Sequence, residues 1–121
     1  MNNLCLEVRD GNGGNGAMAD IWGCANEASK LWAFNGNGPI RSDLGKCLDI
    51  VAANKGVGAG VNMVDYHDDW RAQQWRWDGS QIISKLSGLC LQISAANRDV
   101  GAAVEVWGRN GGGHQQWHPV V

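Results

Sequence analysis

The sequence has no excess of positive charge and no basic run. Its 121 residues carry ten Lys and Arg against twelve Asp and Glu, which gives a net charge of −2. Proteins that bind nucleic acid without sequence preference rely on many cationic contacts to phosphate. The composition therefore argues against nucleic acid as the partner.

Long apolar runs are also missing. No apolar stretch approaches the roughly 18 residues of a membrane span, so we expect no membrane insertion. Residues 1–4 lack the basic and apolar regions of a signal peptide, which leaves open a cytosolic location, or a leader removed before residue 1. No Cys-x-x-Cys pair is present, and His67, His114 and His118 are not spaced as metal ligands, so no metal site is expected.

A helical stripe is absent too. No segment of about 11 or more residues repeats apolar side chains at helical spacing. There are 18 glycines, and Asn-Gly-Asn-Gly at residues 35–38 and Asp-Gly at residues 78–79 are hairpin-turn signals. Short runs such as Val61–Val64 and Val104–Trp107 alternate in the manner of half-buried strands. The sequence predicts an all-β fold.

Residues 11–16 read Gly-Asn-Gly-Gly-Asn-Gly, which matches the form of a dinucleotide-binding fingerprint. That motif requires a helix after it, because the helix N-terminus faces the pyrophosphate. A strand is expected at residues 17–24 instead. We therefore interpret the glycine-rich stretch as a loop and expect no cofactor.

Two short phrases recur three times in the same register. Cys-Leu-x-Val or Cys-Leu-x-Ile begins at Cys5, Cys47 and Cys90, and a second phrase ends in tryptophan at residues 32, 75 and 117. Two independent phrases that repeat at the same spacing predict three copies of one unit of about 42 residues. We expect a single domain over residues 1–121, with copies at about residues 1–43, 44–86 and 87–121.

Each copy is expected to arrange its strands in the same order. The Cys-Leu strand is followed by a glycine-rich loop, an alternating strand and the tryptophan strand, and the first two copies add a short strand at Ile40 or at Ile82 and Ile83. A solenoid of such units is extended and usually needs capping units. Three units of four short strands can instead close into a barrel, which removes the sheet edges.

The triplicated Cys-Leu-Asp and Gln-x-Trp phrases resemble the ricin B-type lectin family, whose fold is a β-trefoil with pseudo-threefold symmetry. The resemblance covers nearly the whole chain. It implies that Trp32, Trp75 and Trp117 belong to the core near the threefold axis. We count eleven strands where a trefoil has twelve, so either the first strand is short or a partner chain, as in a homodimer, covers the edge.

The resemblance also implies a disulfide between Cys5 and Cys24, a spacing that the family uses within one repeat. The same offset from the other two cysteines reaches Tyr66 and Arg109, so both are expected to be buried small hydrophobes. A disulfide favours a secreted or extracellular location.

Galactose offers a flat patch of C–H groups among its hydroxyls, so its site needs an aromatic plate and a carboxylate or amide acceptor. In the family these groups come from the third residue of the Cys-Leu-Asp phrase, the end of the alternating strand and the residues before the last tryptophan. The carbohydrate-binding residues that the resemblance implies are Glu7, Asp20, Trp22 and Lys30 in the first copy, Asp49, Asn62, Tyr66 and Gln73 in the second, and Gln92, Glu105, Trp107, His114 and Gln115 in the third.

No copy matches the family pattern in full. Glu7 is one methylene longer than the expected aspartate, and Gln92 in the same position of the third copy is neutral. Val64 stands where the second copy should have its plate, and it cannot stack on a sugar. Tyr66 or Trp70, from the loop that follows, is the candidate replacement.

The alternation of their strands predicts that Trp22 and Trp107 point outward. An exposed tryptophan is unusual without a ligand or partner, which makes these two the leading candidate plates. Glu105 lies beside Trp107 and can compensate for the neutral Gln92.

The function that these residues favour is a non-catalytic lectin for glycans ending in galactose or N-acetylgalactosamine, with up to three shallow sites that act together. The alternatives are a trefoil module that binds proteins or inhibits proteases, or a sugar-binding module cut from a larger toxin or hydrolase. An enzyme is not expected, because Asp68 and Asp69 would point to opposite faces of a strand and no nucleophile and base accompany them.

Overall fold

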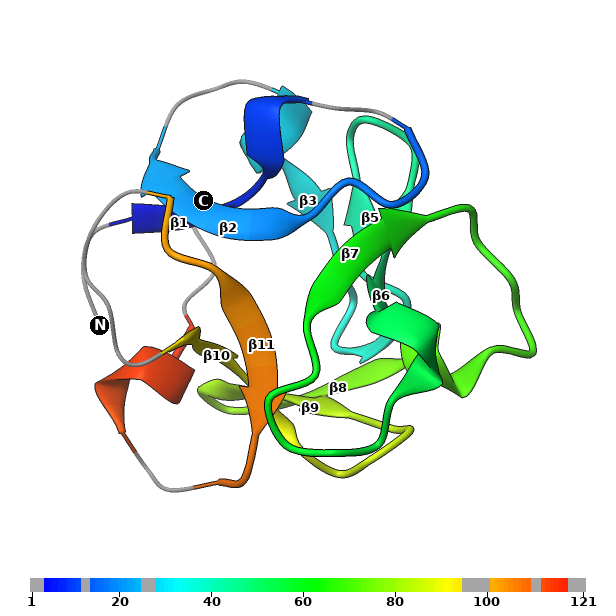
Figure 1. The fold of residues 1–121 in the computed structure, drawn as a ribbon, viewed down its shortest axis with the longest axis vertical. Helices are drawn as coiled ribbons and strands as arrows, with labels where there is room; N and C mark the ends of the chain where they lie inside the picture. Colours follow the sequence, from blue (N-terminus) through cyan, green and yellow to red (C-terminus); the bar gives the residue numbers. More distant parts are fainter. Residues whose placement is uncertain (1–3, 12–13, 25–27, 95–100, 110–111, 118–121) are drawn as a thin grey trace.

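The computed structural model describes residues 4–11, 14–24, 28–94, 101–109 and 112–117. These residues form eleven β-strands and short 3-10 turns with no α-helix among them, so the predicted all-β class is confirmed (Figure 1). The strands are β1 (Leu4–Val8), β2 (Ala19–Gly23), β3 (Trp32–Ala33), β4 (Asn37–Gly38), β5 (Arg41–Ser42), β6 (Cys47–Ile50), β7 (Val61–Val64), β8 (Trp75–Asp78), β9 (Gln81–Ser84), β10 (Cys90–Ile93) and β11 (Val104–Trp107). A helix with the length and apolar character of a membrane span does not occur in this part of the chain.

The Cys-Leu strand of each copy pairs with the alternating strand that follows it. β1 pairs antiparallel with β2, β6 with β7 and β10 with β11, in an equivalent register. Directly opposed residues on antiparallel strands share one face of the sheet. The register therefore sets three polar cross-strand pairs, which are Glu7 with Asp20, Asp49 with Asn62, and Gln92 with Glu105.

The three hairpins are arranged around a pseudo-threefold axis, and β2, β7 and β11 surround the centre of the view in Figure 1. In each copy a loop glycine at positive φ donates its backbone N–H to the next copy. These glycines are Gly16, Gly58 and Gly101, and the acceptors are the carbonyl oxygens of Met63, Val106 and Ile21, each at 2.7 Å. Glycine suits these positions because positive φ is strained for other residues. The ring of equivalent bonds, from first copy to second to third and back, is the closure of a β-trefoil.

The three repeat tryptophans anchor the Cys-Leu strands in the same way. The indole N–H groups of Trp32, Trp75 and Trp117 donate to the carbonyl oxygens of Leu6 (2.9 Å), Leu48 (3.1 Å) and Leu91 (3.0 Å) respectively, each 26 or 27 residues earlier in the sequence. Trp75 is fully buried, and the other two are half-buried and pack against the core. Burial of such large apolar surface is the main stabilising contribution of the repeat.

The cysteines follow the prediction. Cys5 and Cys24 form a disulfide with their Cα atoms 5.2 Å apart. Cys47 and Cys90 are free and fully buried. Burial raises the pKa of both thiols, so they behave as small apolar side chains.

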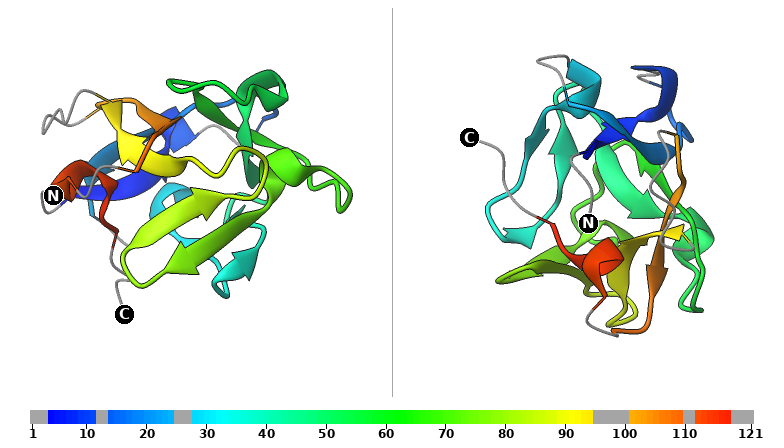
Figure 2. Two further views of the ribbon diagram at one scale, coloured as in Figure 1. Left: turned by 90° about the horizontal axis from the view of Figure 1, so that it is seen from below. Right: turned by 90° about the vertical axis from the view of Figure 1, so that its left-hand side faces the viewer.

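The tryptophan strands differ from the prediction in the third copy. Trp117 lies outside any strand, and its backbone N–H donates to the carbonyl oxygen of Ser80 at 2.8 Å. Within the described residues, a single backbone bond thus joins Trp117 to the β8–β9 hairpin in place of the predicted strand. In Figure 2 (left) that yellow-green hairpin lies at one end of the molecule, opposite the orange β11.

The short strand predicted at Ile40 is also wrong in detail. Ile40 is buried but lies between β4 and β5, where Gly38 has a φ of 129° and Pro39 has no N–H to donate to a ladder. β4, which was not predicted, pairs with β8 through Gly38 and Trp75. The described residues contain eleven strands, the number that we counted, but β4 takes the place of the strand expected at Trp117. The boundaries of the three copies stay a prediction.

Candidate functional site

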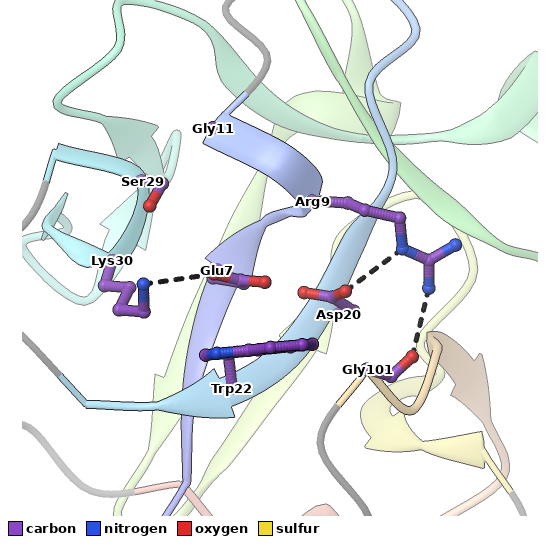
Figure 3. A pocket seen from close by; sticks show the side chains of 8 residues that line it. All are labelled: Glu7, Arg9, Gly11, Asp20, Trp22, Ser29, Lys30 and Gly101. Carbon is purple, nitrogen blue, oxygen red and sulfur yellow. Dashed lines mark hydrogen bonds and ion pairs between the residues drawn. The ribbon is translucent and has the colours of Figure 1, made fainter.

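The clearest pocket lies beside the first hairpin. It has a volume of about 390 Å³ and opens to solvent. Its walls come from β1, β2, the turn at residues 28–30 and a loop of the third copy (Figure 3). The side chains and backbone that matter most for its chemistry belong to Glu7, Arg9, Asp20, Trp22, Lys30 and Gly101, and we call this group site 1.

Two adjacent carboxylates lie between two cations along the floor of site 1. The Nζ of Lys30 lies 3.3 Å from an oxygen of Glu7, and the Nε–H of Arg9 donates to Oδ2 of Asp20 at 3.0 Å. Glu7 and Asp20 are cross-strand neighbours and both are buried. Burial raises the pKa of Glu7 above its ordinary 4.5, the neighbouring Asp20 adds to the rise, and Lys30 opposes it. Two flanking cations thus offset two adjacent carboxylates, which are acceptors for hydroxyl groups.

Trp22 forms the apolar side of site 1. Its side chain is 44% exposed, so the predicted outward orientation is confirmed. Figure 3 shows its ring beside Glu7 and Asp20 at the pocket. The edge of the ring rests on the third copy, because a Cβ built on Gly101 would lie 3.5 Å from Trp22 Cζ3.

The third copy also has an exposed tryptophan, but an amide and a carboxylate stand where the first copy has two carboxylates. Trp107 is 42% exposed, and a Cβ built on Gly58 would lie 3.3 Å from its Cζ3, so a glycine supports this ring too. Beneath it, the Nε2 of Gln92 donates to a carboxylate oxygen of Glu105 at 2.8 Å. We call the group around Trp107 site 3 and assign His114 to it, because this half-buried residue belongs to the turn Gly113–Gln115, which packs against β10.

Gln73 and Gln115 lie below their sites, fully buried. The Nε2 of Gln115 donates to Gln92 Oε1 at 3.1 Å and to the Gly108 carbonyl oxygen at 2.8 Å. The Nε2 of Gln73 donates in the same manner to the carbonyl oxygen of Asp65 at 2.8 Å. Both amides therefore hold the backbone just after the plate position, and their contribution to a site is to position it.

The second copy has the polar pair but no plate on its strand. Asp49 and Asn62 are opposed across β6 and β7, and burial raises the pKa of Asp49. Val64 occupies the plate position and is half-buried. We call this group site 2.

The aromatic residues of the second copy lie on the loop after β7. The guanidinium carbon of Arg41 lies 4.5 Å from the centre of the Tyr66 ring, a cation–π contact. Trp70 is 43% exposed and stacks on His67, with 3.8 Å between the ring centres. One face of each candidate plate is thus already in contact with another side chain.

Three site residues escaped the sequence analysis, namely Arg9, Gly58 and Gly101. Arg9 lies two positions after Glu7, so strand periodicity could have placed it on the same face. The two glycines carried no such signal, because their role depends on contacts between copies. Within the described residues no cluster of three or more His, Cys, Asp or Glu could hold a metal ion.

The hairpins, the closure and the exposed tryptophans define a class, the carbohydrate-binding β-trefoils. A family model described as the ricin-type beta-trefoil lectin domain matches residues 1–117. The chain belongs to this family.

Individual relatives agree with that assignment. The chain is 47% identical over 45 residues to the ribosome-inactivating protein SNAIf of Sambucus nigra, a match of 37% of this chain and 8% of that protein. It resembles the agglutinin from Abrus precatorius with a TM-score of 0.84 and 30% identity, over 97% of this chain and 44% of that one. It shares its fold with the C-half of an earthworm R-type lectin solved with GalNAc, with a TM-score of 0.76 and 21% identity, over 92% and 85% of the chains. The chain thus spans only a small part of the curated relative that it matches.

Proposed function

We propose that this protein is a non-catalytic lectin for galactose-type sugars, galactose or N-acetylgalactosamine at the end of a glycan. The observation that carries the proposal is site 1, where the exposed ring of Trp22 stands beside the carboxylates of Glu7 and Asp20 in an open pocket. The ring offers a surface for the C–H face of galactose, and the carboxylates accept bonds from the neighbouring hydroxyls.

Site 3 is the second sugar site in this proposal. Trp107 is the plate, and the paired Gln92 and Glu105 supply an amide and a carboxylate in place of two carboxylates. His114 is a further donor or acceptor at its edge. A neutral amide bonds hydroxyls less strongly than a carboxylate, so we expect site 3 to bind galactose less tightly than site 1.

Site 2 is the weakest of the three. Asp49 and Asn62 keep the acceptors, but Val64 offers no ring. Tyr66 and Trp70 are the candidate plates, and each has one face against another side chain.

A shallow site of this kind binds one sugar with a dissociation constant of about 1 mM, or about −4 kcal/mol. Two or three sites on one rigid domain raise the avidity for a surface that carries many glycans. A homodimer would double the number of sites. The earthworm lectin solved with GalNAc supports the sugar class, because it has the same fold.

The partial match to a ribosome-inactivating protein favours one variant of the proposal, in which the chain is the sugar-binding module of a larger toxin. Sugar recognition is common to both variants. Haemagglutination followed by competition with free sugars therefore tests this shared property, whichever variant holds.

A glycan array tests the proposal directly. Binding to glycans that end in galactose or N-acetylgalactosamine is the expected result. A blank array with protein that gives a folded NMR spectrum would contradict the lectin and favour the protein-binding or protease-inhibitor alternative.

A further inference from the structure

We propose that Arg9 is a positioning residue of site 1. It orients the carboxylate of Asp20 and holds Gly101, the glycine against which the ring of Trp22 lies. The inference rests on the proposed function of that site. Arg9 belongs to the first copy but joins it to the third, through contacts that have no counterpart among the described residues of the other two copies.

The guanidinium of Arg9 uses two donors toward the site. Its Nε–H donates to Asp20 Oδ2 at 3.0 Å, and an Nη2–H donates to the carbonyl oxygen of Gly101 at 3.1 Å (Figure 3). Asp20 is only 1% exposed, and a buried carboxylate without a partner is strongly unfavourable. Arg9 therefore determines where the Asp20 carboxylate points.

The second contact reaches the plate. Gly101 is held on one side by its N–H bond to the carbonyl oxygen of Ile21 at 2.7 Å and on the other by Arg9. The edge of Trp22 rests on this glycine. Arg9 thereby fixes the surface against which the ring lies.

The other copies have no counterpart of this residue. The backbone bond from Arg9 to Met18 is matched by bonds from Val51 to Gly60 and from Ser94 to Ala103. Neither valine nor serine can span the distance to a carboxylate and a neighbouring loop. Site 3, where Gly58 supports Trp107 without an arginine, is therefore an internal control.

The charges of site 1 also make the pH dependence of galactose binding sensitive to Arg9. The groups that face the two carboxylates of Glu7 and Asp20 are Lys30 at one end and Arg9 at the other. Without Arg9 one cation must offset both carboxylates, so the pKa of Glu7, which burial and Asp20 already raise, should rise further. An ionised Glu7 accepts bonds from sugar hydroxyls more strongly than a protonated one, so binding should begin to fail at a higher pH than in the wild type.

The binding test uses the full chain in a Trp107→Ala background, so that galactose titration by NMR reports mainly on site 1. Arg9→Ser introduces the residue of the third copy, Arg9→Lys restores a cation, and Arg76→Ser is the matched control on an exposed position of β8. We expect Arg9→Ser to weaken galactose binding about tenfold and to shift the acid side of its pH profile upward. Arg9→Lys should restore the pH profile and only part of the affinity, because one amine cannot replace both donors.

A test without sugar uses 5-fluorotryptophan labelling and fluorine NMR. Arg9→Ser should shift the Trp22 resonance and leave that of Trp107 unchanged, and Arg76→Ser should move neither. The inference is overturned if the Trp22 resonance stays in place and galactose binding keeps its wild-type affinity and pH profile. If the Trp107→Ala protein binds no galactose at all, the proposed function of site 1 fails, and the fluorine result still decides whether Arg9 positions Trp22.

Discussion

Site 1 and site 3 share one backbone and differ in charge. In both, an exposed tryptophan closes the second strand of a hairpin, rests on a glycine of another copy and stands beside a polar cross-strand pair. Site 1 has two carboxylates between two cations, whereas site 3 has an amide and a carboxylate linked by a buried glutamine. In the proposed function, the threefold backbone would fix where a sugar can lie, and a few side chains would decide how strongly and at which pH it binds.

Site 2 shows what happens when one element of this arrangement is lost. The glycine bond is kept, since Gly16 donates to Met63 as its counterparts do, but nothing lies within 4 Å of a Cβ built on Gly16. Val64 is too short to rest there. The second copy therefore keeps the glycine and its backbone bond, although it has no aromatic ring at the plate position.

The disulfide is the largest difference between the first and third copies. It closes a loop of about 18 residues, and its removal by Cys5→Ser with Cys24→Ser should lower the free energy of unfolding by about 3 kcal/mol. Urea unfolding with and without the double substitution measures this loss. Site 3 has no disulfide nearby in sequence and should keep its galactose affinity under conditions where the variant stays folded. An unchanged unfolding free energy would refute the stabilising role of the bridge.

Removal of one tryptophan plate should abolish or weaken galactose binding at its own site and leave binding at the other site unchanged. Trp22→Ala and Trp107→Ala are each expected to cut affinity at their own site about tenfold or more, because the ring supplies its apolar contact. NMR titration with galactose separates the two sites by their local resonances. Trp70→Ala removes an exposed tryptophan that is a candidate plate of site 2, so it should leave the affinity of site 1 and of site 3 unchanged and is the control for these two sites. Wild-type binding by both plate variants would show that the plates are wrongly assigned.

Exchange of the acid should make site 1 resemble site 3. Glu7→Gln places an amide where the third copy has Gln92, and we expect galactose affinity to fall about threefold to tenfold. The pKa of Glu7 is raised, so in the wild type the carboxylate is present above this raised pKa and is lost as the pH falls through it. Binding at site 1 should therefore decline on acidification beginning above pH 4.5, and Glu7→Gln should remove this contribution. Titrations between about pH 4 and 8 test it, and an identical pH profile in the variant would contradict it.

A plate added to site 2 should produce the smallest effect, a gain of weak binding. Val64→Trp places a ring where Gly16 leaves open space, above the acceptors Asp49 and Asn62. The gain should be modest, because a shallow site for a single sugar binds weakly even with its ring in place. Galactose-dependent shifts in β6 and β7 would record the new site, with Val64→Leu as the apolar control. Equal responses of the two variants would mean that a ring alone does not complete the site.

Much of the fold followed from repeated residues. The Cys-Leu strands and the alternating strands lie where their phrases predict, because alternation of buried and exposed side chains specifies a strand locally. The core role of Trp75 and the pairing of Cys5 with Cys24 agree with the family resemblance. Failures concern segments whose pairing depends on distant partners, such as β4 on β8 and Trp117 beside Ser80.

The candidate sites were predictable to a smaller extent. The alternation of apolar and polar residues predicted that Trp22 and Trp107 point outward, because the direction of a side chain depends only on its position within its own strand. The roles of Arg9 and Gly101 arise from contacts between residues 92 positions apart, which no local pattern encodes. The burial of Gln115 beneath its site is likewise a matter of packing and not of spacing.

The central claim, that one symmetric backbone carries unequal sugar sites, is tested most directly by a galactose titration of the wild-type protein followed residue by residue in a ¹H–¹⁵N NMR spectrum. The account predicts the strongest shifts in β1 and β2, weaker shifts in β10 and β11, and the smallest in β6 and β7. Equal shifts in all three hairpins, or none in any, would contradict it.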